Sequence, residues 1–428
     1  MYQAIFMKSI YFFLSLILLS TGNLLAQAAE EMPAPPFIRT VQFRESGSLL
    51  NAQAQLPIIR LGSGLELSFD DIIGDEANYF YKITHHNADW TESNLMRSEF
   101  MDGMDDVRIL DYENSVAVLQ LYTHYRLKIP NRNVKRLTKT GNYMLSIYND
   151  NHELIFSRKF MIYTPALAVG AQVKRPRDLE FVDEKQTLRF FVDGGDDQLI
   201  NPRRNVKVVL LQNNNLKTAI TDIEPQYTIG TKLEYRYDEE TAFWAGNEFF
   251  GFENRDFRAA TAAIQYIEVR DLYHNFLFTN PTRRDQIYTY NPDINGNFLV
   301  TTLQGINPES EAEYVWIHFS LQHPKLEDDQ EMHVYGNFNN YEIEKTTTME
   351  WNEKQQIYEL PYLLKQGFYN YKYVIVDKNG EIDPQIQPGG NFWQTENEYQ
   401  ILVYYRRPGG RFDELIGYGQ TNSTDITN

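Results

Sequence analysis

YFYKITHHNADW (79–90) and DYENSVAVLQLYTHYRLKIPN (111–131) are the two stretches that decide the fold of this chain. In the first, aromatic or aliphatic residues alternate with others over 79–84, the period of a strand that buries one face. The second contains an alternating run over 119–129 and then Pro130, which cannot donate a hydrogen bond within a sheet. We therefore predict a strand in each stretch, with polar and aromatic side chains crowded between them.

The length and composition predict a multidomain β protein. The chain has 428 residues, which corresponds to roughly three domains of about 100 to 150 residues each. Hydrophobic residues make up 42% of the chain, and the 29 Tyr and 26 Phe are residue types that strands favour. Long helical periodicity is hard to find. We predict an all-β fold of three consecutive immunoglobulin-like or early-set β-sandwich domains.

The charge and the lack of cysteine exclude several classes of function. The formal net charge is -18, and an acidic surface repels phosphate backbones, so we expect no nucleic-acid partner. The sequence contains no cysteine. Structural disulfides, thiolate zinc sites and cysteine nucleophiles are therefore excluded.

Turn-rich segments divide the chain. Gly141-Asn142-Tyr143 and Gly367-Phe368-Tyr369 each lead into an alternating strand, which indicates a shared sandwich type in the first and third domains. The predicted limits are 30–164 for the first sandwich, 165–300 for the second, 301–407 for the third, and 408–428 for a flexible tail.

The N-terminal segment has the pattern of an export signal. Lys8 supplies a positive charge, residues 10–19 are apolar, and small residues follow before position 29. We predict a cleavable signal peptide over 1–29. The alternative is an uncleaved membrane anchor, which the short apolar run disfavours. We expect no transmembrane segment in the mature chain.

The histidines and carboxylates match no catalytic pattern. His85 and His86 are neighbours on a predicted strand and point to opposite faces, so they cannot readily bind one metal ion together. His124 could approach one of them if the two strands pair. The carboxylates between 102 and 113 fit neither a calcium loop nor an acid–base pair. Nucleophile elbows, phosphate-binding loops and zinc-protease motifs are absent. We expect a binding protein and no enzyme, with no catalytic residue, no metal and no cofactor.

Aromatic and acidic side chains are the candidates for an interaction surface. Trp90 and Trp244 fit sandwich cores, whereas Trp393 follows a Pro-Gly-Gly-Asn loop that a core explains less well. Loops at one end of a sandwich can reach a partner without disturbing the sheets. The candidate interface residues are Asp102, Asp105, Asp106 and Trp393.

Several long blocks resemble a known family. FDDI (69–72), YFYKITHHNADW, DYENS (111–115), YTHYRLKIPN (122–131) and GNYMLSIYNDN (141–151) resemble, in this order, the N-terminal domain of the plug protein family of the Bacteroidetes type IX secretion system. WAGNEFFGFENRD (244–256) looks like the continuation of that family. The family-signature residues, which we expect to be structural, are Tyr81, His85, His86, Asn87, Asp89, Trp90, Asp111, Tyr112, Tyr122, His124, Tyr125, Pro130 and Asn131.

The resemblance implies a periplasmic protein that is peripherally associated with the outer membrane. Its expected partner is the outer-membrane translocon barrel, whose periplasmic opening it would seal in the absence of substrate. The alternative is a periplasmic or surface carbohydrate-binding protein. It is suggested by VYGNFNNY (334–341) and GFYNYKY (367–373), which are similar to glycogen-binding and early-set modules. On that alternative, Tyr341, Trp351 or Trp393 would line an exposed platform.

Overall fold

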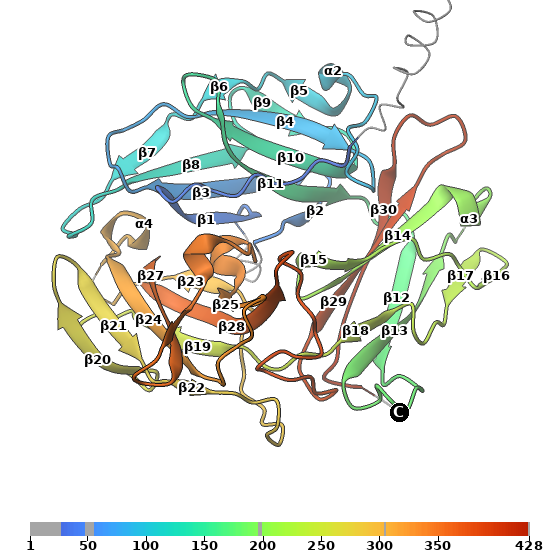
Figure 1. Cartoon of the computed structure of the whole chain (residues 1–428). Coiled ribbons are helices and arrows are strands. Elements are labelled where there is room, and N and C mark those ends of the chain that lie inside the picture. Colours follow the sequence, from blue (N-terminus) through green and yellow to red (C-terminus); the bar gives the residue numbers. More distant parts are fainter. Residues whose placement is uncertain (1–26, 48–54, 196–198, 304, 427–428) are drawn as a thin grey trace, which may run out of the picture.

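The computed structural model describes residues 27–47, 55–195, 199–303 and 305–426 (Figure 1). The predicted all-β class is confirmed, because strands form nearly all regular structure there. The short helices are α2 (Arg97–Phe100), α3 (Pro202–Asn205), α4 (Pro308–Glu311), η1 (Asn337–Asn339) and η2 (Lys345–Thr347). Across these ranges, no helix is long and apolar enough to span a membrane. Most of the predicted signal peptide lies outside the described residues.

The first sandwich packs two antiparallel-rich sheets face to face. One sheet has the order β1 (Ile38–Glu45), β3 (Leu65–Asp71), β8 (Thr123–Ile129), β7 (Asp111–Asn114). The other has the order β2 (Ile58–Arg60), β11 (Leu154–Tyr163), β10 (Gly141–Tyr148), β4 (Phe80–His86), β6 (Val107–Arg108), and a ribbon of β5 (Met101–Gly103) and β9 (Val134–Leu137) lies beside them. Phe69, Tyr79 and Tyr125 form an aromatic cluster between the sheets, with ring centroids 4.9–5.2 Å apart.

The two stretches that decide the fold become strands of different sheets. Residues 80–86 form β4, and the second strand begins at Thr123, later than the alternating run suggests. Each pairs within its own sheet, β4 with β10 and β8 with β3. His124 therefore does not approach His85 or His86 through strand pairing.

The second sandwich combines strands from two distant parts of the chain. One sheet has the order β12 (Ala168–Lys174), β13 (Lys185–Asp193), β17 (Lys232–Tyr235), β16 (Tyr227–Ile229), with β18 (Ala242–Trp244) also paired to β13. The other has the order β15 (Asn215–Ile220), β14 (Val206–Gln212), β29 (Glu398–Tyr405), β30 (Glu414–Asn422). Figure 1 shows the red C-terminal strands beside the green strands of residues 168–244.

The third sandwich is built from the segment between β18 and β29. One sheet has the order β19 (Phe250–Glu253), β28 (Gly367–Asp377), β23 (Phe298–Val300), and β25 (Gln330–Tyr335) also pairs with β28. The other has the order β20 (Ile264–Val269), β21 (Tyr273–Leu277), β24 (Tyr314–Gln322), β27 (Ile357–Lys365), β26 (Glu350–Asn352), with β22 (Asn280–Pro281) paired to β24.

The strand pairings correct the predicted domain limits. Strands β19 to β23, which the sequence assigned to the second sandwich, belong to the third, and β29 pairs with β14 of the second. Alternation along the sequence identifies a strand. It does not identify the neighbouring strand, because strands pair through backbone hydrogen bonds that every residue type except proline can make. The boundary at 300 was therefore wrong: the third sandwich is an insertion within the second.

The predicted flexible tail was also wrong. Strand β30 pairs antiparallel with β29 over Glu398–Tyr405, and Leu415 and Ile416 are buried in two different clusters. The Gly-, Ser- and Thr-rich composition concealed this short apolar pair. Gly417 and Gly419 pack against Val403 and Val169, where a larger residue would clash.

We expect Leu415→Ala to destabilise the protein by about 2–5 kcal/mol, because the side chain is fully buried and truncation leaves a cavity. Leu179→Ala is the matched control, since Leu179 is 87% exposed in the same sandwich, and it should change the free energy of unfolding by less than about 0.5 kcal/mol. Urea unfolding measures both. If both substitutions changed the free energy of unfolding by the same small amount, the C-terminal segment would be a flexible tail after all.

Candidate functional site

The first half of the signature lies where the first sandwich meets the second. The His85 ring is buried, with Nε2 3.0 Å from the Thr140 carbonyl and Nδ1 2.8 Å from Ser93 Oγ. A carbonyl can only accept, so Nε2 carries the proton and Nδ1 accepts from the serine. Burial lowers the pKa of His85 to about 4, against the opposing effect of the Thr140 carbonyl. His85 is a neutral packing residue at neutral pH.

His86 is satisfied in the same way by different partners. Its Nδ1 lies 3.0 Å from the Trp90 carbonyl and donates to it, and Nε2 lies 2.8 Å from Thr84 Oγ1. Burial lowers its pKa below the ordinary value. Across the described residues no group of three or more His, Asp or Glu side chains is placed to hold a metal ion.

Residues 87–90 fasten the first sandwich to the second through Asp413. The Ala88 amide donates to Asp413 Oδ2 at 3.1 Å, and Arg406 bridges Asp413 and Asn87 at 2.7 and 2.9 Å. Behind them, the buried Tyr404 hydroxyl donates to Asn142 at 2.6 Å. This part of the signature joins the first and second sandwiches through a network of hydrogen bonds.

Asp89 and Trp90 complete this corner of the interface. Asp89 accepts from the Thr91 hydroxyl at 2.6 Å and lies 3.9 Å from Lys207 Nζ. The Trp90 ring lies 4.5 Å from Lys159 Nζ, the geometry of a cation–π contact. The sequence placed Trp90 in a sandwich core, whereas in the structure it is partly buried at a boundary between sandwiches.

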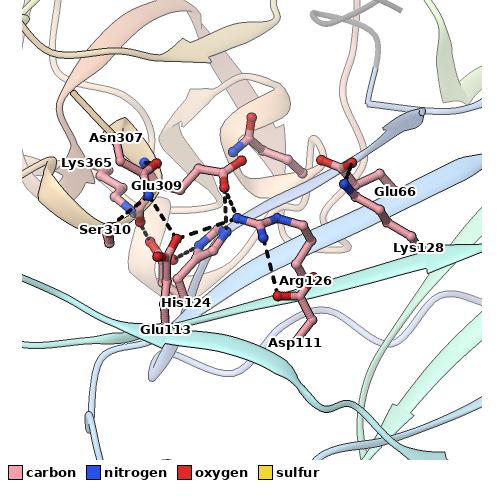
Figure 2. Close-up of polar contacts among 12 residues, drawn as sticks. Glu66, Asp111, Glu113, His124, Arg126, Lys128, Asn307, Glu309, Ser310 and Lys365 are labelled. Atoms are coloured by element: carbon pink, nitrogen blue, oxygen red, sulfur yellow. Dashed lines mark hydrogen bonds and ion pairs between the residues drawn. The ribbon is translucent and has the colours of Figure 1, made fainter. Parts of the chain in front are cut away.

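The second half of the signature lies where the first sandwich meets the third (Figure 2). The outer face of β3 carries Ser68 and Asp70, which are buried because the third sandwich covers them. Asp70 receives Lys365 Nζ at 2.7 Å, Tyr314 OH at 2.7 Å and His124 Nδ1 at 2.6 Å. The Asp70 and Lys365 side chains are 0% and 1% exposed, so this ion pair is completely desolvated.

The local chemistry keeps Asp70 ionised. Burial alone would raise its pKa, but the Lys365 ammonium and the His124 hydrogen bond outweigh that effect and hold the pKa below its usual value. Burial pulls the pKa of Lys365 down, and Asp70 opposes that shift. Lys365 also donates to the Glu309 carbonyl at 2.7 Å and lies 4.0 Å from the Tyr122 ring centroid.

A more exposed layer of charges surrounds the buried pair. Arg126 of β8 contacts Glu309 of α4 and lies 3.3 and 3.5 Å from Asp111 and Glu113. Asn307 donates to Glu113 at 3.0 Å, which ties α4 to β7. Tyr122 OH donates to the Ala312 carbonyl at 2.9 Å from a fully buried position. The signature residues Asp111, Tyr122 and His124 therefore belong to one inter-sandwich network.

The remaining signature residues stabilise the first sandwich itself. Tyr125 OH donates to the Ala77 carbonyl at 2.7 Å, and its ring lies 5.6 Å from that of Tyr112. After Pro130, the Asn131 side chain accepts from the amides of Asn133 and Val134 at 2.9 Å, and its amide nitrogen lies 3.0 Å from Tyr81 OH. These contacts close the turn that ends β8.

The predicted interface carboxylates already have partners in the structure. Asp105 is buried, accepting from the Ile83 amide and from Arg97, both at 2.7 Å. Asp102 lies 3.2 Å from Arg136, and Asp106 lies 3.5 Å from Lys82. Trp393 lies on the second sandwich, 4.4 Å beneath the Arg175 guanidinium. The first sandwich uses the acidic segment partly to hold itself together.

An apolar loop that sequence reasoning missed lies beside α4. In the loop between β7 and β8, Val116, Leu119 and Leu121 are 59%, 53% and 61% exposed, and Ile73 on the adjacent loop is 61% exposed. Gly74 packs next to Leu121, which places the two loops in contact. We call these four side chains the apolar loop patch. The run VAVLQL carried the signal, but its alternation suggested the start of a strand.

The loop that carries the patch is fixed from the third sandwich. The buried Glu313 carboxylate accepts from the Leu119 and Gln120 amides at 2.7 and 3.2 Å, and the Val116 amide donates to the Ser310 carbonyl at 2.9 Å. Figure 1 shows this loop at one end of the first sandwich, close to α4. Exposed apolar side chains on a fixed backbone are typical of a binding surface.

The residues proposed for a glycan platform are not brought together. Tyr341 is buried, and Trp393 lies on a different sandwich. Trp351 is partly buried against Tyr358, yet it borders a groove of about 820 Å³ on the outer sheet of the third sandwich. Tyr266, Phe276 and His318 stack in series along this groove, with centroids 4.3 and 3.9 Å apart.

Comparisons with known proteins agree with this architecture. Residues 38–164 match the family model described as type 9 secretion system plug protein 1st domain. The crystal structure of a hypothetical protein from Parabacteroides merdae ATCC 43184 is similar to the chain, with a TM-score of 0.86 and 30% sequence identity. The match covers 92% of this chain and 100% of that one. No curated protein matches.

We expect Lys365→Met to destabilise the protein by about 3–5 kcal/mol, because it leaves the Asp70 carboxylate buried without its counter-ion. Urea unfolding followed by tryptophan fluorescence measures the loss. Lys325→Met is the matched control: Lys325 pairs with Glu353 at 2.6 Å, but both side chains are more than half exposed, so the unfolding midpoint should stay the same. Equal midpoints for the two variants would contradict a structural role for the buried pair.

Proposed function

Because the chain belongs to the plug protein family of the type IX secretion system, we propose that it docks on the periplasmic opening of the outer-membrane translocon barrel and seals it in the absence of substrate. The family indicates a plug role in type IX secretion and a place near the outer membrane. Together with the all-β fold, it points to an accessory protein that makes and breaks no bonds. The proposed mechanism is mass action between the plug and other occupants of one pore.

The rigidity of the molecule supports a sealing role. A pore that passes folded cargo leaks unless its plug keeps one shape. The buried Asp70–Lys365 pair fixes the first sandwich to the third, and Asp413 fixes it to the second. These polar contacts favour a single arrangement of the sandwiches, because moving one sandwich relative to another would leave buried charges without their partners. The three sandwiches should therefore act as one body.

The apolar loop patch is the observation that carries the docking proposal. It lies on the family-matched sandwich, its backbone is preformed, and no other described segment covers its exposed side chains. The net charge of -18 keeps the rest of the surface hydrated. A partner that buries these residues gains apolar contact, and binding does not incur the entropy cost of ordering the loop.

We expect the triple variant Val116→Ser, Leu119→Ser and Leu121→Ser to reduce capture of the solubilised translocon barrel at least about tenfold, since three exposed apolar side chains lose their contact area. The measurement is a titrated pulldown with the tagged protein, with the barrel identified by mass spectrometry. The matched control changes Leu179, Ile229 and Val269 to Ser. These residues lie on the other sandwiches and are at least as exposed as the three patch residues.

The outcomes separate the docking surface from the function. If the wild type captures the barrel and the patch variant captures it equally well, the patch is not the docking surface. If the folded wild type never captures the barrel, the plug function itself is wrong. Asp102→Lys with Asp106→Lys tests the acidic candidate surface in the same assay, and since Arg136 and Lys82 already neutralise these carboxylates, we expect unchanged capture.

A second candidate function is glycan binding in the groove of the third sandwich. The stacked Tyr266, Phe276 and His318 rings offer flat faces of the kind on which sugars pack, and Trp351 borders the same groove. Titration with soluble oligosaccharides should then change tryptophan fluorescence in the wild type and not in Trp351→Phe. Unchanged wild-type fluorescence would remove this candidate.

A further inference from the structure

A cleft of about 800 Å³ lies between the second and third sandwiches. β15 and β25 both contribute to it, and Asn215 of β15 donates to Tyr335 OH of β25 at 3.1 Å. Its walls are mostly apolar and include Trp244, Phe249, Phe250, Tyr335, Tyr373 and Val374. Clefts of this size and lining accept small organic ligands.

Three cationic residues line the cleft, Lys217, Arg283 and Lys372, and Lys217 is paired with Glu342. Lys372 Nζ lies 3.9 Å from the Phe249 ring centroid and, among the described residues, has no hydrogen bond or ion pair. Arg283 stacks 3.9 Å above the Phe250 ring and donates to the Glu248 carbonyl, and its buried Nε has no partner in the described part of the chain. Lys372 therefore keeps its donors for a ligand, and Arg283 adds a second positive charge beside the cleft.

The nearby carboxylates are committed to other donors. Asp293 accepts from the Asn295 and Phe249 amides, and Glu248 accepts from Tyr288 OH and the Glu396 amide. Neither carboxylate lines the cleft. Two other carboxylates line the cleft: Glu342 pairs with Lys217 at 2.7 Å, and Glu381 is exposed. Among the described residues, Lys372 and Arg283 are the cations of the cleft that have no ion pair.

The environment of Lys372 favours an added anion. The pKa of Lys372 is lowered to about 8. Burial is the largest cause, Asp293 and Glu248 oppose the shift, and the neighbouring Arg283 adds to it. An anion in contact with Nζ would replace the lost hydration of the ammonium.

We propose that this cleft binds a small carboxylate with an apolar body, an acyl or aryl acid, through Lys372 and Arg283. The carboxylate takes the free donors of the Lys372 ammonium and is attracted by the Arg283 charge, and the apolar body lies along the aromatic walls. An inorganic anion would leave most of the volume and the apolar lining unused. A multiply charged ligand would meet the field of Asp293 and Glu248 behind the cations.

The test is isothermal titration of the full mature chain with laurate and with 3-phenylpropionate, each below its aggregation concentration. Binding of either acid, with dodecanol and inorganic phosphate at least tenfold weaker, is expected. Lys372→Met should weaken binding at least tenfold, because it keeps the apolar stem and removes the charge. Lys135→Met, a change to an exposed lysine of the first sandwich, should leave it unchanged.

A second measurement needs no variant. For the wild type, affinity should fall between pH 7 and pH 10, because the Lys372 ammonium is lost above its pKa of about 8 while the acid stays ionised and Arg283 stays charged. Absence of binding by both acids, equal binding of phosphate or dodecanol, or affinity independent of pH and of Lys372→Met would each overturn the proposal. None of these results depends on capture of the translocon.

Discussion

The buried pair of Asp70 and Lys365 is the contact on which the arrangement of this protein depends. Two full charges lie without water between the first and third sandwiches, and Tyr314 and His124 donate to the same carboxylate. Two sandwiches in contact through an apolar interface of the same area could slide against each other, whereas the buried ion pair allows only one relative position. The outer face of β3 thus becomes a core surface, although its own sequence alternates like a strand with one wet face.

The insertion of the third sandwich into the second ties the remaining parts together. The chain leaves the second sandwich after β18, builds all of the third, and returns as β29 to pair with β14. The second sandwich is not complete until its C-terminal strands, β29 and β30, are in place. Tyr404 and Asp413 on these returning segments then hold the first sandwich. Each sandwich is thereby fixed by the other two, which suits a body that closes an opening by its shape.

Residues that look chemically active are mostly used inside the molecule. His85, His86 and Asp105 each have internal partners that leave little capacity for a ligand. The features that face outward are different in kind. They are the apolar loop patch, whose backbone Glu313 holds, and the cleft where Lys372 has no hydrogen bond or ion pair among the described residues. Unsatisfied surfaces, and not the signature residues, mark the places where this protein can meet other molecules.

Local patterns were enough to predict the strands, the all-β class and the family of the first sandwich. Alternation over 79–84 and the stop at Pro130 act within a few residues, so they can be recognised without knowing any partner. The pairing of β29 with β14, the burial of β30 and the meeting of Asp70 with Lys365, 295 positions apart, were decided by the tertiary structure. The backbone hydrogen bonds between strands do not depend on side-chain identity, so the sequence does not show which strands pair. A charged residue such as Asp70 is predicted to be exposed unless its distant counter-ion is known.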